Sequence, residues 1–237
     1  MLWCKASSTP IELGSKDKMF QGEPVDRTRY QKLVGKLIYL PHTRLDIAFA
    51  VSLVSQYMHN PCQGHLDIVY RILKYLKQAP GKGLFYKRPD DRTIKVFRDA
   101  DWVVWGNLVT RRSKKQNVIA RSNAEAESRA MTHGVCEVIC LKRIYEELVL
   151  EFDGQIQLYC DNQSTINIAH NHVQHDRTKH VEVYRHFIKE KIEGKLIKIS
   201  HVSTGQQLTD ILTKELSDKQ YHIFLSKLEL IKIYHPA

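Results

Sequence analysis

Four carboxylates occupy positions where short structural elements are expected to begin or end. Asp99 and Asp161 each end a predicted strand, Glu127 lies early in a predicted helix, and Asp210 lies in a short predicted helix. Each acid alone is explained as well by a turn or by a helix N-terminus. Together they suit two hard divalent cations, which need several oxygen ligands converging from different elements. The four acids are therefore candidate ligands of a two-metal site.

Two neighbouring acids are weaker candidates. Asp101 shares a strand face with Asp99 but lies beyond the end of the strand. Glu125 stands three residues after Ser122, which is the spacing of an S-x-x-E capping box, so its side chain is expected to bond to the helix start. Neither is included in the candidate site.

The elements that position these acids follow a change of hydrophobic period. Before the turn "APGKG" (79–83), apolar residues recur at helical spacing in three segments, 29–40, 44–60 and 64–78. After it, strands and helices alternate, which favours a mixed α/β sheet. The predicted strands are 83–87, 93–99, 107–110, 117–120, 155–161 and 195–202, and the predicted helices are 122–150, 163–170, 179–192 and 206–214.

The net charge of the chain favours a polyanionic partner, and its cysteine pattern favours a reducing compartment. The 237-residue chain holds 36 Lys and Arg against 26 Asp and Glu, a net charge of +10. Its five cysteines form no C-x-x-C pair, and no apolar run is long enough to span a membrane. We therefore expect an intracellular protein, in the cytoplasm or the nucleus, with nucleic acid as its partner and no membrane.

Two basic segments are candidate contacts to nucleic-acid phosphates. They contribute Arg111, Arg112, Lys114, Lys115, Arg177 and Lys179. The alternative is that both segments are ordinary charged surface.

Several long motifs resemble one family in collinear order. "DADW", "ARSNAEAES", "LYCDNQSTINIA", "HDRTKHVEVYRHFIKEKI" and "QQLTDILTK" resemble the ribonuclease H domain of copia-type LTR retrotransposon Pol polyproteins. "YQKLVGKLIYLPHTRLDIAFAVSLVSQYM" and "RILKYLKQAPGKGLFYK" resemble the thumb-side end of the adjoining reverse transcriptase. The resemblance covers nearly the whole chain.

The resemblance implies a fold, a division into domains and an activity. It implies a ribonuclease H-like mixed sheet with flanking helices at 92–215, preceded by a partial, thumb-like helical region at 1–85 and followed by a tail at 216–237. The activity would be hydrolysis of the RNA strand of RNA–DNA hybrids with two Mg²⁺ ions, or Mn²⁺ in their place. Other nucleic acids and other parts of a Pol polyprotein are further partners that it implies.

The resemblance also assigns roles to the four acids. Asp99 would bridge both ions, with Glu127 and Asp161 on one side and Asp210 on the other. One ion would activate the attacking water and the other would stabilise the leaving 3′ oxygen. His201 lies near the position of a histidine that assists product release in many ribonucleases H; the alternative is an ordinary strand-end histidine, and His201 is not included in the candidate site.

The chain departs from the family pattern in two places. No Y-x-D-D motif occurs, so polymerase activity is not expected. After Trp102 the pattern lacks about 20 residues, a strand with its connections, and "WVVWGN" is interpreted as the site of a deletion. The strand from Asn107 should then pair directly with the Asp99 strand or leave an open edge. The alternative function is an inactive Pol remnant that only binds nucleic acid.

Overall fold

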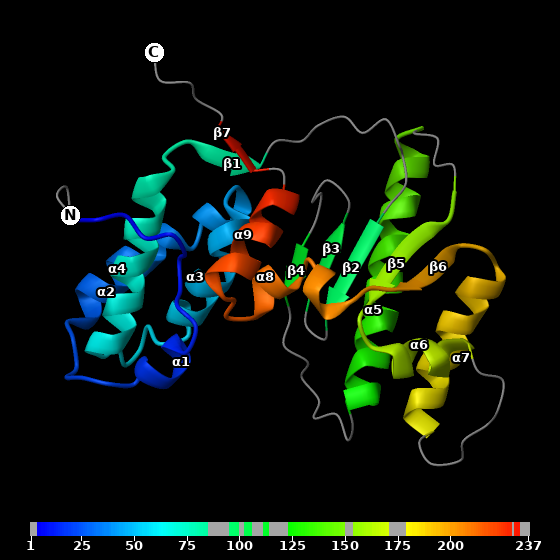
Figure 1. The fold of residues 1–237 in the computed structure, drawn as a ribbon. Helices are drawn as coiled ribbons and strands as arrows, with labels where there is room; N and C mark the ends of the chain where they lie inside the picture. The colour runs from blue at the N-terminus through cyan, green and yellow to red at the C-terminus, as the bar shows by residue number, and fades with distance from the viewer. Residues whose placement is uncertain are drawn as a thin grey trace. The chain divides into compact units, whose positions relative to one another are not determined.

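The computed structural model describes the chain as two compact units. The described residues are 4–84, 95–99, 102–105, 111–113, 123–149, 154–170, 179–228 and 230–232. The first unit, here the helical unit, joins Met1–Phe85 with Asp210–Ala237, and the second, here the sheet unit, is Tyr86–Thr209 (Figure 1). The helical unit is therefore built from both ends of the chain.

The described part of the helical unit is mostly helix. Asp26 caps α2 by accepting a hydrogen bond from the Thr28 N–H at 2.9 Å, and Ser217 caps α9 by accepting one from the Gln220 N–H at 3.4 Å. The α-helices are α1 (Ser15–Lys18), α2 (Arg27–Leu37), α3 (Ala48–Ser55), α4 (Gln63–Gln78), α8 (Asp210–Thr213) and α9 (Asp218–Lys227). The segment predicted as one helix at 44–60 divides into a 3₁₀ turn, Leu45–Ile47, and the shorter α3.

Residues from the two ends of the chain share the core of the helical unit. Tyr30 and Val34 of α2 and Ile72 of α4 are fully buried, as are Leu212 of α8 and Phe224 of α9. A short antiparallel pair, β1 (Lys82–Leu84) with β7 (Leu230–Lys232), joins the same two segments. Figure 1 draws red α9 beside the blue and cyan helices. The division into domains that was predicted from the sequence differs from these two units, because it placed 210–215 with the sheet and 216–237 in a tail.

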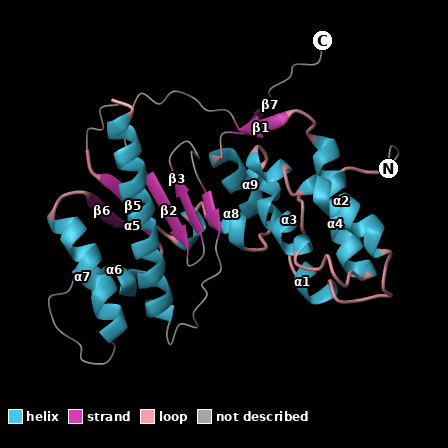
Figure 2. Cartoon of the chain, turned by 180° about the vertical axis from the view of Figure 1, so that it is seen from behind, coloured by secondary structure: helices cyan, strands magenta, loops and turns pink. Residues whose placement is uncertain are grey.

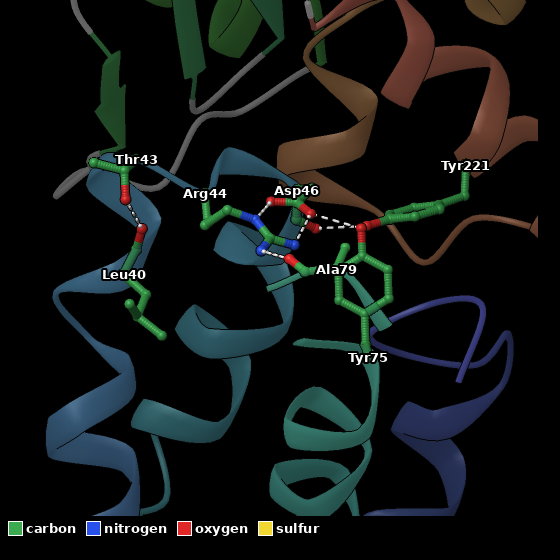
Figure 3. A network of polar contacts seen from close by, with 7 residues as sticks. All are labelled: Leu40, Thr43, Arg44, Asp46, Tyr75, Ala79 and Tyr221. Carbon is green, nitrogen blue, oxygen red and sulfur yellow. Dashed lines mark hydrogen bonds and ion pairs between the residues drawn. The ribbon is translucent and has the colours of Figure 1, made fainter. Parts of the chain in front are cut away.

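A buried polar network connects α9 to the N-terminal segment (Figure 3). The Arg44 guanidinium donates from Nε and Nη2 to the two carboxylate oxygens of Asp46, at 3.0 and 2.7 Å. Tyr75 donates its hydroxyl to Asp46 Oδ2 at 2.6 Å, and Tyr221 donates to the Asp46 main-chain oxygen at 3.1 Å. The remaining Arg44 branch, Nη1, donates to the Ala79 carbonyl at 3.1 Å. The buried charges are thus paired and hydrogen-bonded, as burial requires.

The sheet unit holds a five-stranded mixed sheet. Its strands are β2 (Lys95–Asp99), β3 (Trp102–Trp105), β4 (Arg111–Ser113), β5 (Ile156–Cys160) and β6 (Ile197–His201). In the order β4-β3-β2-β5-β6, the first three form an antiparallel meander, and β5 and β6 run parallel to β2.

Three helices accompany the sheet, and Figure 2 shows them from behind. They are α5 (Asn123–Glu147), α6 (Gln163–His170) and α7 (Lys179–Glu193). One apolar core joins the layers, with Val96, Met131, Leu158, Ile188 and Ile197 all 0–1% exposed. Alternate residues of β5 are buried, as the period of a strand requires. None of the helices in the described ranges is long and apolar enough to cross a membrane.

The segment after Asp99 differs from its prediction. Trp102–Trp105, to which the sequence prediction assigned no strand, forms β3 and pairs with β2 in the register Asp99↔Trp102. Branched and aromatic side chains favour an extended backbone, and the sequence prediction did not use this signal. The basic stretch Arg111–Ser113 supplies β4. The strands predicted at 107–110 and 117–120 lie outside the described residues.

Candidate metal centre

Two of the four candidate acids stand next to each other at one edge of the sheet. β2 and β5 are parallel neighbours with the register Val96↔Leu158 and Phe97↔Tyr159. Continuing that register by two residues sets Asp99, the last residue of β2, opposite Asp161, which directly follows β5. The Asp99 side chain lies outside the description, and Asp161 is half-buried. The backbones of these two acids therefore lie side by side at one strand edge.

Local interactions fix the position of Asp161. Phe97 and Tyr159 stack with their ring centroids 4.8 Å apart, which holds β2 and β5 in register. Beyond β5, the Asn162 N–H donates to Cys160 Sγ at 3.4 Å, and Asn162 Oδ1 accepts from the Thr165 N–H at 3.1 Å to cap α6. Asp161 is thus held between a buried strand end and a capped helix.

The third acid, Glu127, lies in the first two turns of α5, a helix that contacts β2. Its side chain is outside the description. The neighbouring Glu125 is 5% exposed and accepts a hydrogen bond from Arg129 Nη2 at 2.8 Å. Its predicted capping partner Ser122 lies outside the described residues. The i, i+4 spacing of Glu125 and Arg129 was the available sequence signal for their pairing, and the sequence prediction did not use it.

The fourth acid belongs to the helical unit. Asp210 is the first residue of α8, is 4% exposed, and pairs with Lys214 Nζ at 2.8 Å. The structure thus assigns Asp99, Glu127 and Asp161 to one unit and Asp210 to the other. Among the side chains that the structure describes, no three of the His, Cys, Asp and Glu type gather closely enough to hold a metal ion.

The predicted phosphate contacts are distributed over two elements and the segments beside them. Arg111 and Arg112 lie in the edge strand β4, and Lys179 is the first residue of α7. Lys114, Lys115 and Arg177 lie outside the described residues. His201 ends β6, opposite Cys160, and is exposed.

The acids present fit a divalent cation in chemistry and in backbone placement. Carboxylates are the hard oxygen ligands that Mg²⁺ takes, and the carboxyl ends of adjacent parallel strands are a common place for a site. The paired positions of Asp99 and Asp161 meet both requirements.

Comparison with known proteins places the chain among transposon relatives. It is 32% identical over 249 residues to the retrovirus-related Pol polyproteins from transposons RE1 and RE2 of Arabidopsis thaliana, and 34% identical over 210 residues to that from transposon TNT 1-94 of Nicotiana tabacum. These matches cover 98%, 98% and 82% of this chain. No protein-family model and no solved structure matches.

The chain spans a small part of these relatives. It covers 17% of each Arabidopsis protein and 16% of the tobacco protein. The 249-residue alignment is longer than the 237-residue chain, so those relatives carry residues that this chain lacks. The chain is therefore a homologue of one segment of the retrovirus-related Pol polyproteins of plant transposons.

Proposed function

We propose that the chain is a retrotransposon-derived ribonuclease H-type endonuclease that hydrolyses the RNA strand of RNA–DNA hybrids. The observation that carries this proposal is the register of β2 and β5, which sets Asp99 opposite Asp161 at the carboxyl edge of the sheet. Acids at paired backbone positions of such an edge suit two-metal hydrolysis, because divalent cations need oxygen ligands that come from more than one element.

The arrangement of the sheet unit supports the same proposal. An antiparallel meander, β2-β3-β4, is extended by the parallel strands β5 and β6, and α5, α6 and α7 contact this sheet or one another. A mixed sheet with flanking helices is the architecture that the resemblance to ribonuclease H domains implies. The copia-type assignment is part of the proposal.

Each candidate residue has a chemical task in this proposal. Asp99, Glu127 and Asp161 of the sheet unit would hold divalent cations. The cations, when bound, supply an activated water and stabilise the leaving 3′ oxygen. Arg111, Arg112 and Lys179 would contact the phosphates of the hybrid, for which the net charge of +10 gives a long-range attraction.

A second function, nucleic-acid binding without catalysis, is favoured by one specific observation. Asp210 lies in the helical unit, where its buried carboxylate is neutralised by Lys214 at 2.8 Å. The residues that the relatives carry and this chain lacks point in the same direction. An inactive Pol remnant would retain the basic surface and lose the hydrolysis.

A substrate comparison tests the proposal. The purified full chain is incubated with Mg²⁺ and with RNA labelled at its 5′ end, presented as an RNA–DNA hybrid, as an RNA duplex or as a single strand. We expect cleavage of the hybrid alone, stopped by EDTA. Binding of the hybrid without any cleavage would establish the remnant instead, and cleavage of all three RNAs would overturn the proposed specificity.

A further inference from the structure

A buried ion pair lies in the first turns of α5, close in sequence to Glu127. The side chains of Arg129 and Glu125 are 11% and 7% exposed, and Arg129 Nη2 lies 2.8 Å from Glu125 Oε1. Water screens a pair this deeply buried far less than it screens a surface pair. The contribution of the ion pair to stability therefore depends on its geometry. Replacing either partner should destabilise the first turns of α5.

The same arginine connects α5 to α7. Arg129 Nε donates to the Tyr184 hydroxyl at 3.3 Å, and the guanidinium lies over the Tyr184 ring, 5.8 Å from its centroid. Tyr184 is half-buried on α7, a helix that packs along α5. Glu125, Arg129 and Tyr184, here called the α5 clamp, therefore join the first turns of α5 to the neighbouring helix.

The α5 clamp and the core contacts act on different faces of α5. Met131, Val135 and Val138 form the stripe of α5 that lies in the core of the sheet unit. At about 100° per residue, position 127 lies beside this stripe on one flank, and positions 125 and 129 lie beyond its other flank. Contacts on two faces restrict the rotation of the helix about its axis. The clamp thus restrains the backbone at position 127 against rotation about the helix axis.

We propose that Arg129 is a positioning residue that sets the rotation of the first turns of α5 and so presents Glu127 to the edge where Asp99 and Asp161 stand. This inference rests on the proposed function, since Glu127 is a ligand only if that edge binds cations. Arg129 acts through the helix and needs no contact with the metal or the substrate. Groups that orient ligands in this way change metal affinity by about 10–100-fold.

The test uses Arg129→Met, with Lys142→Met as the matched control. Lys142 forms an i, i+4 pair with Glu146 on the same helix, but at 3.5 Å and with side chains 37% and 57% exposed. Mn²⁺ binding is measured on the full chain by water-proton relaxation, and amide hydrogen exchange reports the order of α5. We expect Arg129→Met to weaken Mn²⁺ binding about tenfold or more and to speed exchange in the first turns of α5. Lys142→Met should change neither.

A milder variant covers the case in which Arg129→Met does not fold. Tyr184→Phe keeps the ring under the guanidinium and removes only the hydroxyl that accepts from Arg129, so a smaller loss of Mn²⁺ affinity is expected with normal folding. Folded variants with wild-type affinity would overturn the positioning role and leave the proposed function intact. A wild-type chain that binds Mn²⁺ no better than its Asp161→Asn variant would overturn both.

Discussion

Tyr221 donates its hydroxyl hydrogen bond to the main-chain oxygen of Asp46, a residue 175 positions earlier in the sequence, at 3.1 Å. The Glu215 carboxylate makes a second connection of this kind, because it accepts from the main-chain N–H groups of Gly14 and Lys16 at 2.9 and 2.8 Å. The segment that carries Asp210 is therefore anchored in the helical unit. The stability of that unit depends on residues from both ends of the chain.

Replacing Tyr221 by Phe should destabilise the helical unit. The aromatic ring stays, but the Asp46 carbonyl loses its buried donor, which costs about 1–3 kcal/mol of unfolding free energy. Urea unfolding followed by circular dichroism measures the change. Tyr39→Phe, at a side chain 76% exposed, makes the same chemical change at the surface and should have almost no effect. Equal stabilities of the two variants would contradict the role of this hydrogen bond.

Asp46→Asn should be more damaging than Tyr221→Phe. The substitution leaves the Arg44 guanidinium, whose side chain is 6% exposed, without its anionic partner, and it weakens acceptance from Tyr75. Breaking one side of a buried pair costs about 3–5 kcal/mol. The same urea experiment measures this loss, with the exposed Asp17→Asn as the control. A loss no larger than that of the control would refute the account of the network.

Stability should fall at alkaline pH because of the buried tyrosines. Burial, with the Asp46 carboxylate as a second cause, raises the pKa of Tyr75 and of Tyr221 above the usual 10.0. The unfolded chain then loses these protons at a lower pH than the folded chain. The stabilisation that the protonated tyrosines give to the folded chain is therefore complete below about pH 10 and is lost as the pH rises above that value. The slope reaches about 1.4 kcal/mol per pH unit for each tyrosine. Tyr221→Phe should show a shallower slope between about pH 9 and pH 11, and an unchanged slope would contradict the assignment.

Hybrid binding should weaken steeply with salt. Each phosphate contact adds roughly 0.9 to the negative slope of log affinity against log salt concentration. Lys179→Met should lower the affinity for all sequences and reduce that slope by about 1. Fluorescence anisotropy with a labelled hybrid measures both quantities. Lys219→Met, at an exposed position of α9, is the control. A slope that Lys179→Met leaves unchanged would remove this residue from the phosphate contacts.

The sequence predicted those features that depend on local patterns. Strand period was enough to predict strands that end at Asp99 and beside Asp161, and the helix at 163–170 has the predicted bounds. Features that depend on distant partners were not predictable in this way. Nothing local in "QQLTDILTK" indicates that α8 packs with α3, and the capping-box reading of Glu125 overlooked its bond to Arg129.

Cleavage by an Asp161 variant tests the central claim most directly. The full chain and its Asp161→Asn variant are compared on an RNA–DNA hybrid in Mg²⁺, with Asp67→Asn, at an exposed acid of α4, as the control for an equal change of charge. The two-metal account predicts that the wild type and Asp67→Asn cleave alike. It also predicts that Asp161→Asn is slower by at least about 100-fold while still binding the hybrid. Equal cleavage by all three proteins, or cleavage by none, would contradict it.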